Sequence, residues 1–134
     1  MSNSALNLAD DFAVLKPNLT VETVSVSPTV YAELDAKYNQ FKNHALVSQY
    51  EFSEDWPTWE RHPAGDEIVV LLSGKADMML RVGGKDECVS LREPSAHVVV
   101  PAGVWHTAKT SEKTRMLFVT PGEGTENCVA KDLP

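Results

Sequence analysis

Four ionisable side chains stand beside two short turns. In the stretch "ERHPAGDE", Glu60 and His62 precede the first turn and Glu67 follows it; in "PAGVWH", His106 follows the second. Each stretch adjoins an apolar run typical of a buried strand. Imidazoles and carboxylates can share a divalent cation or a proton. The first question is therefore whether these four groups converge on one point or only decorate loops.

The spacing of the first group predicts convergence. Glu60 and His62 are two residues apart, so on a strand they face the same side. The proline and glycine of 63–66 predict a turn. Glu67 would then begin a returning strand as a cross-strand neighbour of His62, on the face shared with alternate apolar residues. All three side chains, and His106 after its own turn, are predicted to point into the mouth of a barrel.

The segments that would position these groups are short and rich in β-forming residues. After residue 43, Gly, Pro, Asp and Lys separate eight such runs, at 45–52, 56–62, 67–73, 76–82, 87–92, 97–101, 105–110 and 114–120. Closely spaced strands with short turns predict an all-β antiparallel barrel or sandwich. Strands and helices do not alternate, which argues against a doubly wound parallel sheet.

Residues 1–43 show a different pattern and are expected to form an extension. Helical spacing predicts a short helix within 4–16, from Leu8, Phe12 and Leu15, and alternation predicts a strand at 21–27. An amphipathic helix is predicted after Pro28, with Tyr31, Leu34, Tyr38 and Phe41 on one face. This apolar face needs a surface to cover. The extension is therefore expected to pack on its own barrel or across the two-fold axis of a homodimer.

The two motifs together resemble those of the cupin superfamily. Its first motif contains two alternate histidines, a glutamate and a glycine, and its second a proline, a glycine and a histidine. This sequence follows both orders, with Glu60, His62, Glu67 and Gly74 in the first motif and Pro101, Gly103 and His106 in the second. The resemblance covers residues 56–121, and "HPAGDE", "VPAGVWH" and "VTPGEGTE" resemble small bacterial cupins of unassigned function. It implies a jelly-roll barrel, the double-stranded β-helix.

The resemblance also implies a metal site. His62, Glu67 and His106 take three of the four cupin ligand positions, and Glu60 replaces the remaining histidine. Two imidazoles and two carboxylates suit a divalent transition metal such as Mn, Fe, Ni or Zn. Without metal, the paired carboxylates are expected to raise the pKa of at least one of them. The alternative is a cupin that has lost its metal, with Glu60 turned outward and the histidines hydrogen-bonded in the core.

Length and composition limit the number of domains, the kinds of partner and the cellular location that fit this chain. The 134 residues suffice for one domain, expected as an extension (1–43), a barrel core (44–121) and a tail (122–134). A net charge of −7 argues against nucleic acid or an anionic membrane as partner. The longest aliphatic run, 68–72, is too short to span a bilayer, and the start shows no signal-peptide pattern. Cys88 and Cys128, without a CxxC motif, are expected to be free thiols in a cytoplasmic protein.

Three functions fit this site, and the sequence does not separate them. A metal with open positions would serve an enzyme acting on a small oxygen-rich substrate, and the resemblance implies a dioxygenase or an isomerase. No residue is assigned as catalytic. The same pocket without chemistry would be a metal-free module that binds or senses a small molecule. The third possibility is a structural dimeric barrel with a vestigial site, since fold alone does not choose among these.

Overall fold

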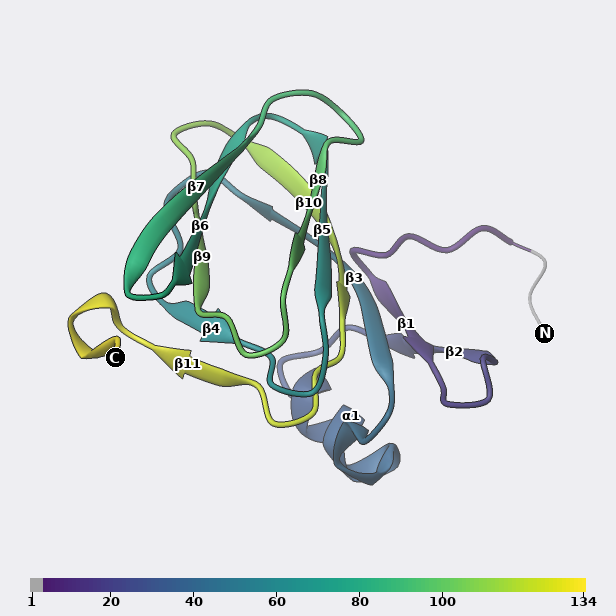
Figure 1. Cartoon of the computed structure of the whole chain (residues 1–134). Helices are drawn as coiled ribbons and strands as arrows, with labels where there is room; N and C mark the ends of the chain where they lie inside the picture. The colour runs from purple at the N-terminus through teal and green to yellow at the C-terminus, as the bar shows by residue number, and fades with distance from the viewer. Residues whose placement is uncertain (1–3) are drawn as a thin grey trace.

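The computed structural model describes residues 4–134, which form a mostly β structure with one α-helix (Figure 1). The strands are β1 (Asp11–Leu15), β2 (Val21–Ser25), β3 (Ala45–Phe52), β4 (Trp59–Arg61), β5 (Glu67–Ser73), β6 (Ala76–Val82), β7 (Lys85–Leu91), β8 (His97–Val100), β9 (His106–Lys109), β10 (Thr114–Thr120) and β11 (Glu126–Cys128). The helices are α1 (Val30–Lys37) and two short 3-10 helices, η1 (Asn39–Phe41) and η2 (Ala130–Asp132).

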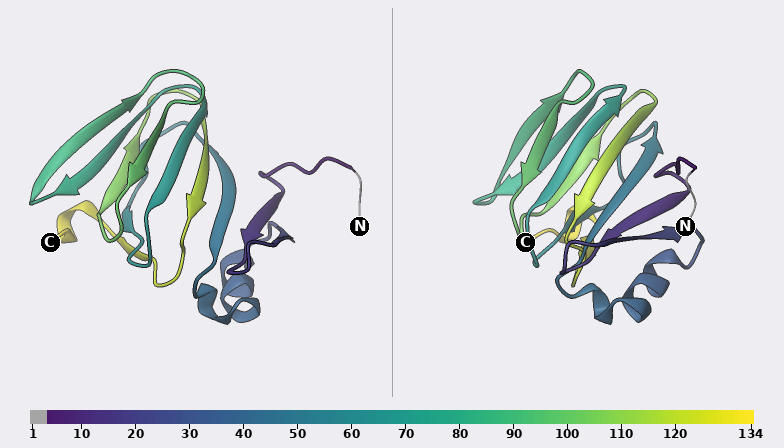
Figure 2. Two further views of the ribbon diagram at one scale, coloured as in Figure 1. Left: turned by 45° about the vertical axis from the view of Figure 1, so that its right-hand side comes forward. Right: turned by 90° about the vertical axis from the view of Figure 1, so that its right-hand side faces the viewer.

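The strands form two facing antiparallel sheets (Figure 2). One sheet has six strands in the order β2-β1-β3-β10-β5-β8, and the other has five in the order β11-β4-β9-β6-β7. Consecutive strands of the chain repeatedly change sheet, as β4 and β5 do. This arrangement confirms the predicted all-β jelly-roll barrel with an N-terminal extension that contains a short helix.

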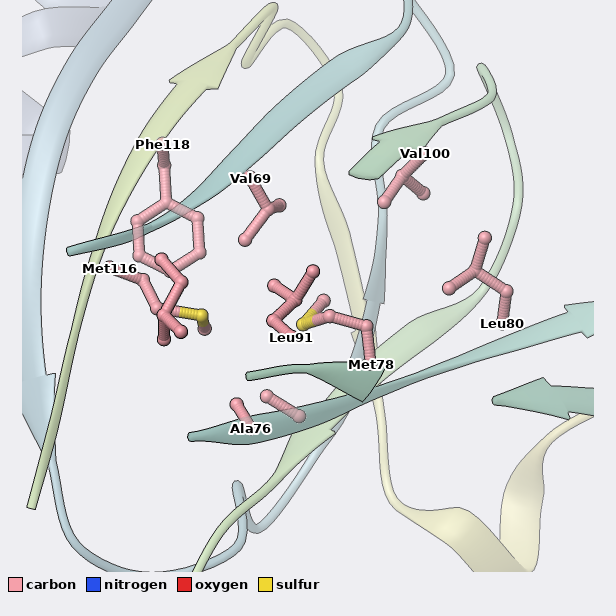
Figure 3. Close-up of a cluster of buried hydrophobic side chains, with 10 residues drawn as sticks. Val69, Ala76, Met78, Leu80, Leu91, Val100, Met116 and Phe118 are labelled. Carbon is pink, nitrogen blue, oxygen red and sulfur yellow. The ribbon is translucent and has the colours of Figure 1, made fainter. Parts of the chain in front are cut away.

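The main core lies between the sheets, because alternate residues of each inward face are apolar. Val69 and Leu71 of the six-stranded sheet meet Ala76 and Met78 of the five-stranded sheet, and all four are at most 1% exposed (Figure 3). Burying each such aliphatic side chain contributes about 1.5–3 kcal/mol before entropy costs. The polar cluster predicted from the sequence is built at one end of this apolar interior.

The strand predictions succeeded where runs of β-forming residues were clearly bounded by turn residues. The observed bounds of β3, β5, β6 and β10 match the runs 45–52, 67–73, 76–82 and 114–120. Residues 122–134 are expected from the sequence to form a tail, whereas the structure contains β11 there, paired with β4. Three residues, only one of them partly buried, give too little alternation for a strand to be recognised.

The helix expected within 4–16 is wrong, because that segment contains β1 instead. Phe12 and Val14 are buried while their neighbours are half-buried, so the burial period is two residues. β1 pairs with β2 on one side and β3 on the other, extending the six-stranded sheet. Backbone pairing with β3 and burial of alternate side chains therefore override the helical spacing of Leu8, Phe12 and Leu15.

The second predicted helix exists but is shorter than expected. It ends at Lys37, and Asn39, Gln40 and Phe41 then take positive φ angles of 53°, 56° and 61°. Leu34, Tyr38 and Phe41 still bury against Phe12 and Val14 in a second core cluster, whereas Tyr31 is 55% exposed. The extension thus packs on its own barrel, and α1 lies at one end of β3 (Figure 2).

The cysteines and the helix lengths bear on two further expectations, namely free thiols and the absence of a membrane-spanning segment. Cys88 and Cys128 are both free thiols, as predicted. Within residues 4–134, none of the helices has both the length and the apolar character needed to cross a lipid bilayer.

Gly74, the last residue of the first motif, makes a tight turn possible. Its φ is +82°, and a Cβ placed there would lie 2.4 Å from the carbonyl oxygen of Lys113. We expect Gly74→Ala to lower the free energy of unfolding by about 2–5 kcal/mol, combining left-handed backbone strain with overpacking. Urea denaturation measures the loss.

Gly83→Ala is the matched control for this substitution. Gly83 also has a positive φ, +59°, but no atom lies within 4 Å of the added methyl group. Only backbone strain should then count, about 1–2 kcal/mol. Equal losses in the two variants would show that the contact with Lys113 is relieved at no cost.

Candidate metal centre

Both motif turns cross from one sheet to the other. β4 lies in the five-stranded sheet and β5 in the six-stranded sheet, so residues 62–66 bridge the sheets. The predicted hairpin, with Glu67 as cross-strand neighbour of His62, is therefore wrong: Glu67 pairs with Val100 of β8. The proline-glycine turn dictates a change of direction but not the hydrogen-bonding partner, because β5 lies between β10 and β8.

The second motif makes an equivalent crossing and is bonded to the first. β8 ends in the six-stranded sheet and β9 begins in the five-stranded sheet. The Gly103 N–H donates to the His62 carbonyl oxygen at 3.0 Å, and the Ala102 N–H donates to Asp66 Oδ1 at 2.8 Å. These two hydrogen bonds hold the crossings side by side, so the residues that flank them face a common space.

All four predicted ligand residues are brought together there. Glu60, His62, Glu67 and His106 each offer one ligand atom, and these atoms lie within 4.8 Å of one another, which makes a possible metal-binding group. His106 Nε2 lies 3.0 Å from Glu67 Oε1 and 3.4 Å from Glu60 Oε1. His62 Nε2 lies 3.3 Å from Glu67 Oε2 and 3.4 Å from Glu60 Oε1. Glu60, paired with His106 across β4 and β9, faces the cluster, and 25% of its side chain is exposed.

Hydrogen bonds on the far side of each imidazole fix its tautomer. His106 Nδ1 lies 3.0 Å from the Val104 carbonyl oxygen, which can only accept, so Nδ1 carries the proton. His62 Nδ1 lies 2.8 Å from the Thr125 hydroxyl, which itself donates to the Gly122 carbonyl and therefore accepts from Nδ1–H. In the neutral rings, both Nε2 lone pairs are left facing the shared space, as in metal-ligating histidines.

The carboxylate of Glu67 is oriented in the same way. The Thr120 hydroxyl donates to Glu67 Oε2 at 2.6 Å. Glu67 Oε1 and both Nε2 atoms are buried and have no hydrogen-bond partner. Buried polar atoms without a partner are rare in folded proteins. A divalent ion bound by these three atoms would satisfy all of them, so the donor set fits a transition metal.

Charge within the metal-free cluster is balanced by the histidines. Burial acts to raise the pKa of Glu60, but the imidazoles of His106 and His62 outweigh it and bring the pKa to about 2. The same competition lowers the pKa of Glu67. The expectation of a raised carboxylate pKa is therefore wrong, because it omitted the imidazoles as counterions. Conversely, burial opposes protonation of His62 and His106, but the carboxylates raise their pKa values to about 9 and about 10.

Beside the cluster lies a cavity of about 960 Å³. Glu60, His62 and Glu67 form part of its wall, and α1 contributes residues from the opposite side. Trp56 also lines it, whereas Trp59 is buried beneath the guanidinium of Arg81.

Two residues that support the site were not predicted from the sequence. Thr120 continues the inward row of Met116 and Phe118 on β10, so a polar residue at the end of an apolar row was the available signal. Thr125 lies in the loop before β11, within the stretch "VTPGEGTE". No periodicity connects it with His62, because it reaches the site through the irregular path of 121–125.

The structure is similar to solved proteins of the double-stranded β-helix type, but the chain matches no family model and no curated protein. A double-stranded β-helix protein from Klebsiella pneumoniae matches with a TM-score of 0.51 and 20% identity, over 63% of this chain and 74% of that one. Recombinant oxalate oxidase in complex with glycolate matches with a TM-score of 0.53 and 17% identity, over 61% of this chain and 45% of that one. A cupin-2 domain protein from Shewanella frigidimarina matches with a TM-score of 0.49 and 19% identity, over 57% and 70%.

The two matches with TM-scores above 0.5 show the fold alone: the chain has a double-stranded β-helix. The chain spans less than half the length of oxalate oxidase, and identities below 25% carry no assignment of activity. Fold and geometry together support a metal site in general terms, at the four residues described above.

The raised histidine pKa values make the metal-free protein sensitive to alkali. A pKa raised above its unfolded value of about 6.5 contributes stability that is fully present below that pH and lost as pH rises through the folded value. For His62 and His106 this window ends at about 9 and about 10. We expect chelator-treated protein to lose on the order of a few kcal/mol of unfolding free energy between pH 7 and pH 10.

Urea denaturation at several pH values, with His97→Gln beside the wild type, measures this loss. His97 is exposed on β8 and outside the cluster, so the variant should follow the wild type. A wild-type unfolding free energy that stays constant to pH 10 would mean that the buried histidines are neutral in the metal-free protein.

Proposed function

We propose that Glu60, His62, Glu67 and His106 bind one divalent transition metal per chain, of the Mn, Fe, Ni or Zn type. The observation that carries this proposal is the convergence of two imidazole nitrogens with fixed tautomers and two carboxylates, three of whose buried atoms have no hydrogen-bond partner. With two neutral imidazoles and two carboxylates, a divalent ion leaves the cluster electrically neutral.

We further propose that the chain is a metal-dependent enzyme acting on a small oxygen-rich substrate in the adjoining cavity. A bound metal would supply Lewis acidity to an oxygen ligand or activation of dioxygen, the two chemistries of isomerase and dioxygenase sites. The chain's own residues hold the ligands in place: Thr120 orients Glu67, Thr125 orients His62, and the Val104 carbonyl orients His106. The adjoining cavity is large enough to hold a small substrate within reach of the cluster.

A metal-free binding or sensing module, or a structural barrel with a vestigial site, remains the competing function. In both, protonated His62 and His106 would serve only to neutralise Glu60 and Glu67. Elemental analysis of protein purified without chelator distinguishes them from the metal site. The free thiols of Cys88 and Cys128 agree with a cytoplasmic setting, which we also propose.

Metal binding is expected to displace protons from both histidines. Because their metal-free pKa values lie at about 9 and about 10, each carries a proton at pH 7 that a metal would replace. The apparent metal affinity should therefore fall by up to about 100-fold per pH unit of acidification below pH 9. Isothermal titration calorimetry in buffers of different ionisation enthalpy should count about two protons released per ion.

Substitutions at Glu60 test its part in this site. Glu60→Ala should weaken metal binding and reduce the stabilisation by metal, which is roughly 2.7 kcal/mol for the wild type at 100-fold the dissociation constant. Glu60→His should preserve or strengthen binding, since it restores the commoner cupin ligand set. Glu126→Ala is the control, because this carboxylate on neighbouring β11 pairs with Arg61 at 3.0 Å and lies outside the cluster. Metal affinity unchanged by Glu60→Ala would remove Glu60 from the ligand set.

We also propose that residues 1–134 form one domain and that the chain is a homodimer. β1 extends the barrel's own sheet, so the extension does not require a partner. The outward face of the six-stranded sheet offers the better surface. Ile68 lies opposite both Val119 and Val99, and Ile68 and Val99 are 39% and 49% exposed. An apolar row across neighbouring strands is the kind of surface that a second copy covers.

Light scattering at micromolar concentration tests the dimer. The wild type should give twice the chain mass, and Val99→Lys should give a monomer because it places a charge in the apolar row. Val82→Lys is the control: Val82 is 43% exposed but lies at the end of β6 in the other sheet. A monomeric wild type would overturn the proposal.

A further inference from the structure

The cavity beside the metal-binding group has an aromatic wall. Phe52, Trp56, Phe118 and Tyr50 follow one another with successive ring centroids 5.7, 5.8 and 6.1 Å apart. All four line the cavity. Such a wall offers a flat ligand a large apolar contact and edge-to-face or stacked geometries. A two-carbon dicarboxylate has no apolar surface to place against it.

Outside the metal-binding group, whose two carboxylates are balanced by its imidazoles or by a bound ion, the charges around the cavity are all negative. These charges belong to Asp35, Glu51 and Glu123, which we call the acidic rim. Among residues 4–134, no lysine or arginine lines it. Arg115 and Lys113 contact Glu51 at 2.9 and 3.8 Å, but from outside the cavity. Recognition of a carboxylate ordinarily uses a guanidinium or ammonium group, and juxtaposed like charges are strongly unfavourable.

Hydroxyl groups supply the polar contacts that the wall lacks. The Tyr31 hydroxyl from α1 and the Tyr50 hydroxyl from β3 are hydrogen-bonded to each other at the cavity. Partial burial raises the pKa of both phenols, and the negative charge of Glu60 adds to this, so both stay protonated; one O–H donates to the other hydroxyl, and the second O–H can donate to a ligand. Ser48 adds a further hydroxyl to the lining, and the Thr120 hydroxyl, which donates its proton to Glu67, can still accept a hydrogen bond. These groups suit the hydroxyl or carbonyl oxygen of an uncharged ligand.

We propose that this cavity binds an aromatic molecule that carries no negative charge and presents a hydroxyl or carbonyl oxygen to the metal-binding group. This deepens the proposed function and concerns the same site, since it names the substrate class. A volume of about 960 Å³ accommodates a bicyclic aromatic body. The carboxylates at the rim exclude simple dicarboxylates, although oxalate oxidase shares the fold.

Two probes that share one aromatic skeleton test whether the cavity prefers an uncharged ligand to an anion. Isothermal titration calorimetry compares 2-naphthalenemethanol with 2-naphthoate, on protein of measured metal content and on chelator-treated protein. We expect the alcohol to bind and the carboxylate to bind at least about tenfold more weakly, because its charge meets the acidic rim. If naphthoate binds chelator-treated protein as tightly as the alcohol does, the proposed preference for an uncharged ligand is wrong.

Two sets of variants separate the contributions to binding. Replacing Asp35→Asn, Glu51→Gln and Glu123→Gln together should reduce the preference for the alcohol at least threefold. The control replaces Glu87→Gln, Glu93→Gln and Asp132→Asn, three exposed residues outside the cavity, and should leave the preference unchanged. If both sets of variants change the preference for the alcohol equally, the carboxylates at the cavity are not responsible for that preference. Trp56→Leu should weaken the binding of 2-naphthalenemethanol at least fivefold while the metal content stays the same. If the affinity is unchanged, the aromatic wall does not contribute to ligand binding.

Failure of this inference and failure of the metal site give different results. If metal binds stoichiometrically but the alcohol does not bind, the ligand class is wrong and the metal centre stands. If the alcohol binds with the expected preference but no metal is found, the ligand class stands and the cavity belongs to a metal-free binding module.

Discussion

Electrical neutrality in a buried space is the constraint on which this structure depends. Two carboxylates and two imidazoles face one another where His62 and Glu67 have almost no access to solvent. The space is neutral with two added protons or with one divalent ion in their place, and with neither it holds two uncompensated negative charges. Removing one member of a buried charged set costs about 3–5 kcal/mol, because its partner is left unpaired. The identity of all four residues is therefore tied to stability as well as to ligand binding.

The fold meets this constraint by giving three of the four ligand residues a hydrogen bond that orients them. Thr120, Thr125 and the Val104 carbonyl each hold one ligand from behind, and all three come from different parts of the chain. Below the cluster, the apolar core between the sheets excludes water (Figure 3). Low polarity strengthens each contact within the cluster and makes any unsatisfied group more costly. The site is thus rigid where it holds its ligands and open only toward the cavity.

The sequence predicted the fold and the four-residue cluster, but by a partly incorrect route. Runs of β-forming residues separated by Gly, Pro, Asp and Lys set the bounds of β5 and β10. The convergence of His62 and Glu67 was inferred from a hairpin, whereas the chain crosses between sheets at that point. A turn sequence records local dihedral angles and not the partner of the next strand, so this topology could not be read locally. β1 and Thr125 were missed for the same reason, since both depend on contacts with distant segments.

The hydrogen bonds between the two crossings make the two motifs one mechanical unit. The Gly103 N–H binds the backbone carbonyl of His62, which any residue at position 62 would supply. The Ala102 N–H binds the Asp66 carboxylate, so this second hydrogen bond requires a side-chain acceptor at position 66. Lengthening either crossing by one residue would displace ligands from both motifs at once. In an alignment of chains that share this site, the two crossing lengths should change together or not at all. A designer who grafts this site onto another barrel should transfer both crossings together with the hydrogen bonds between them, because neither crossing alone positions all four ligand residues.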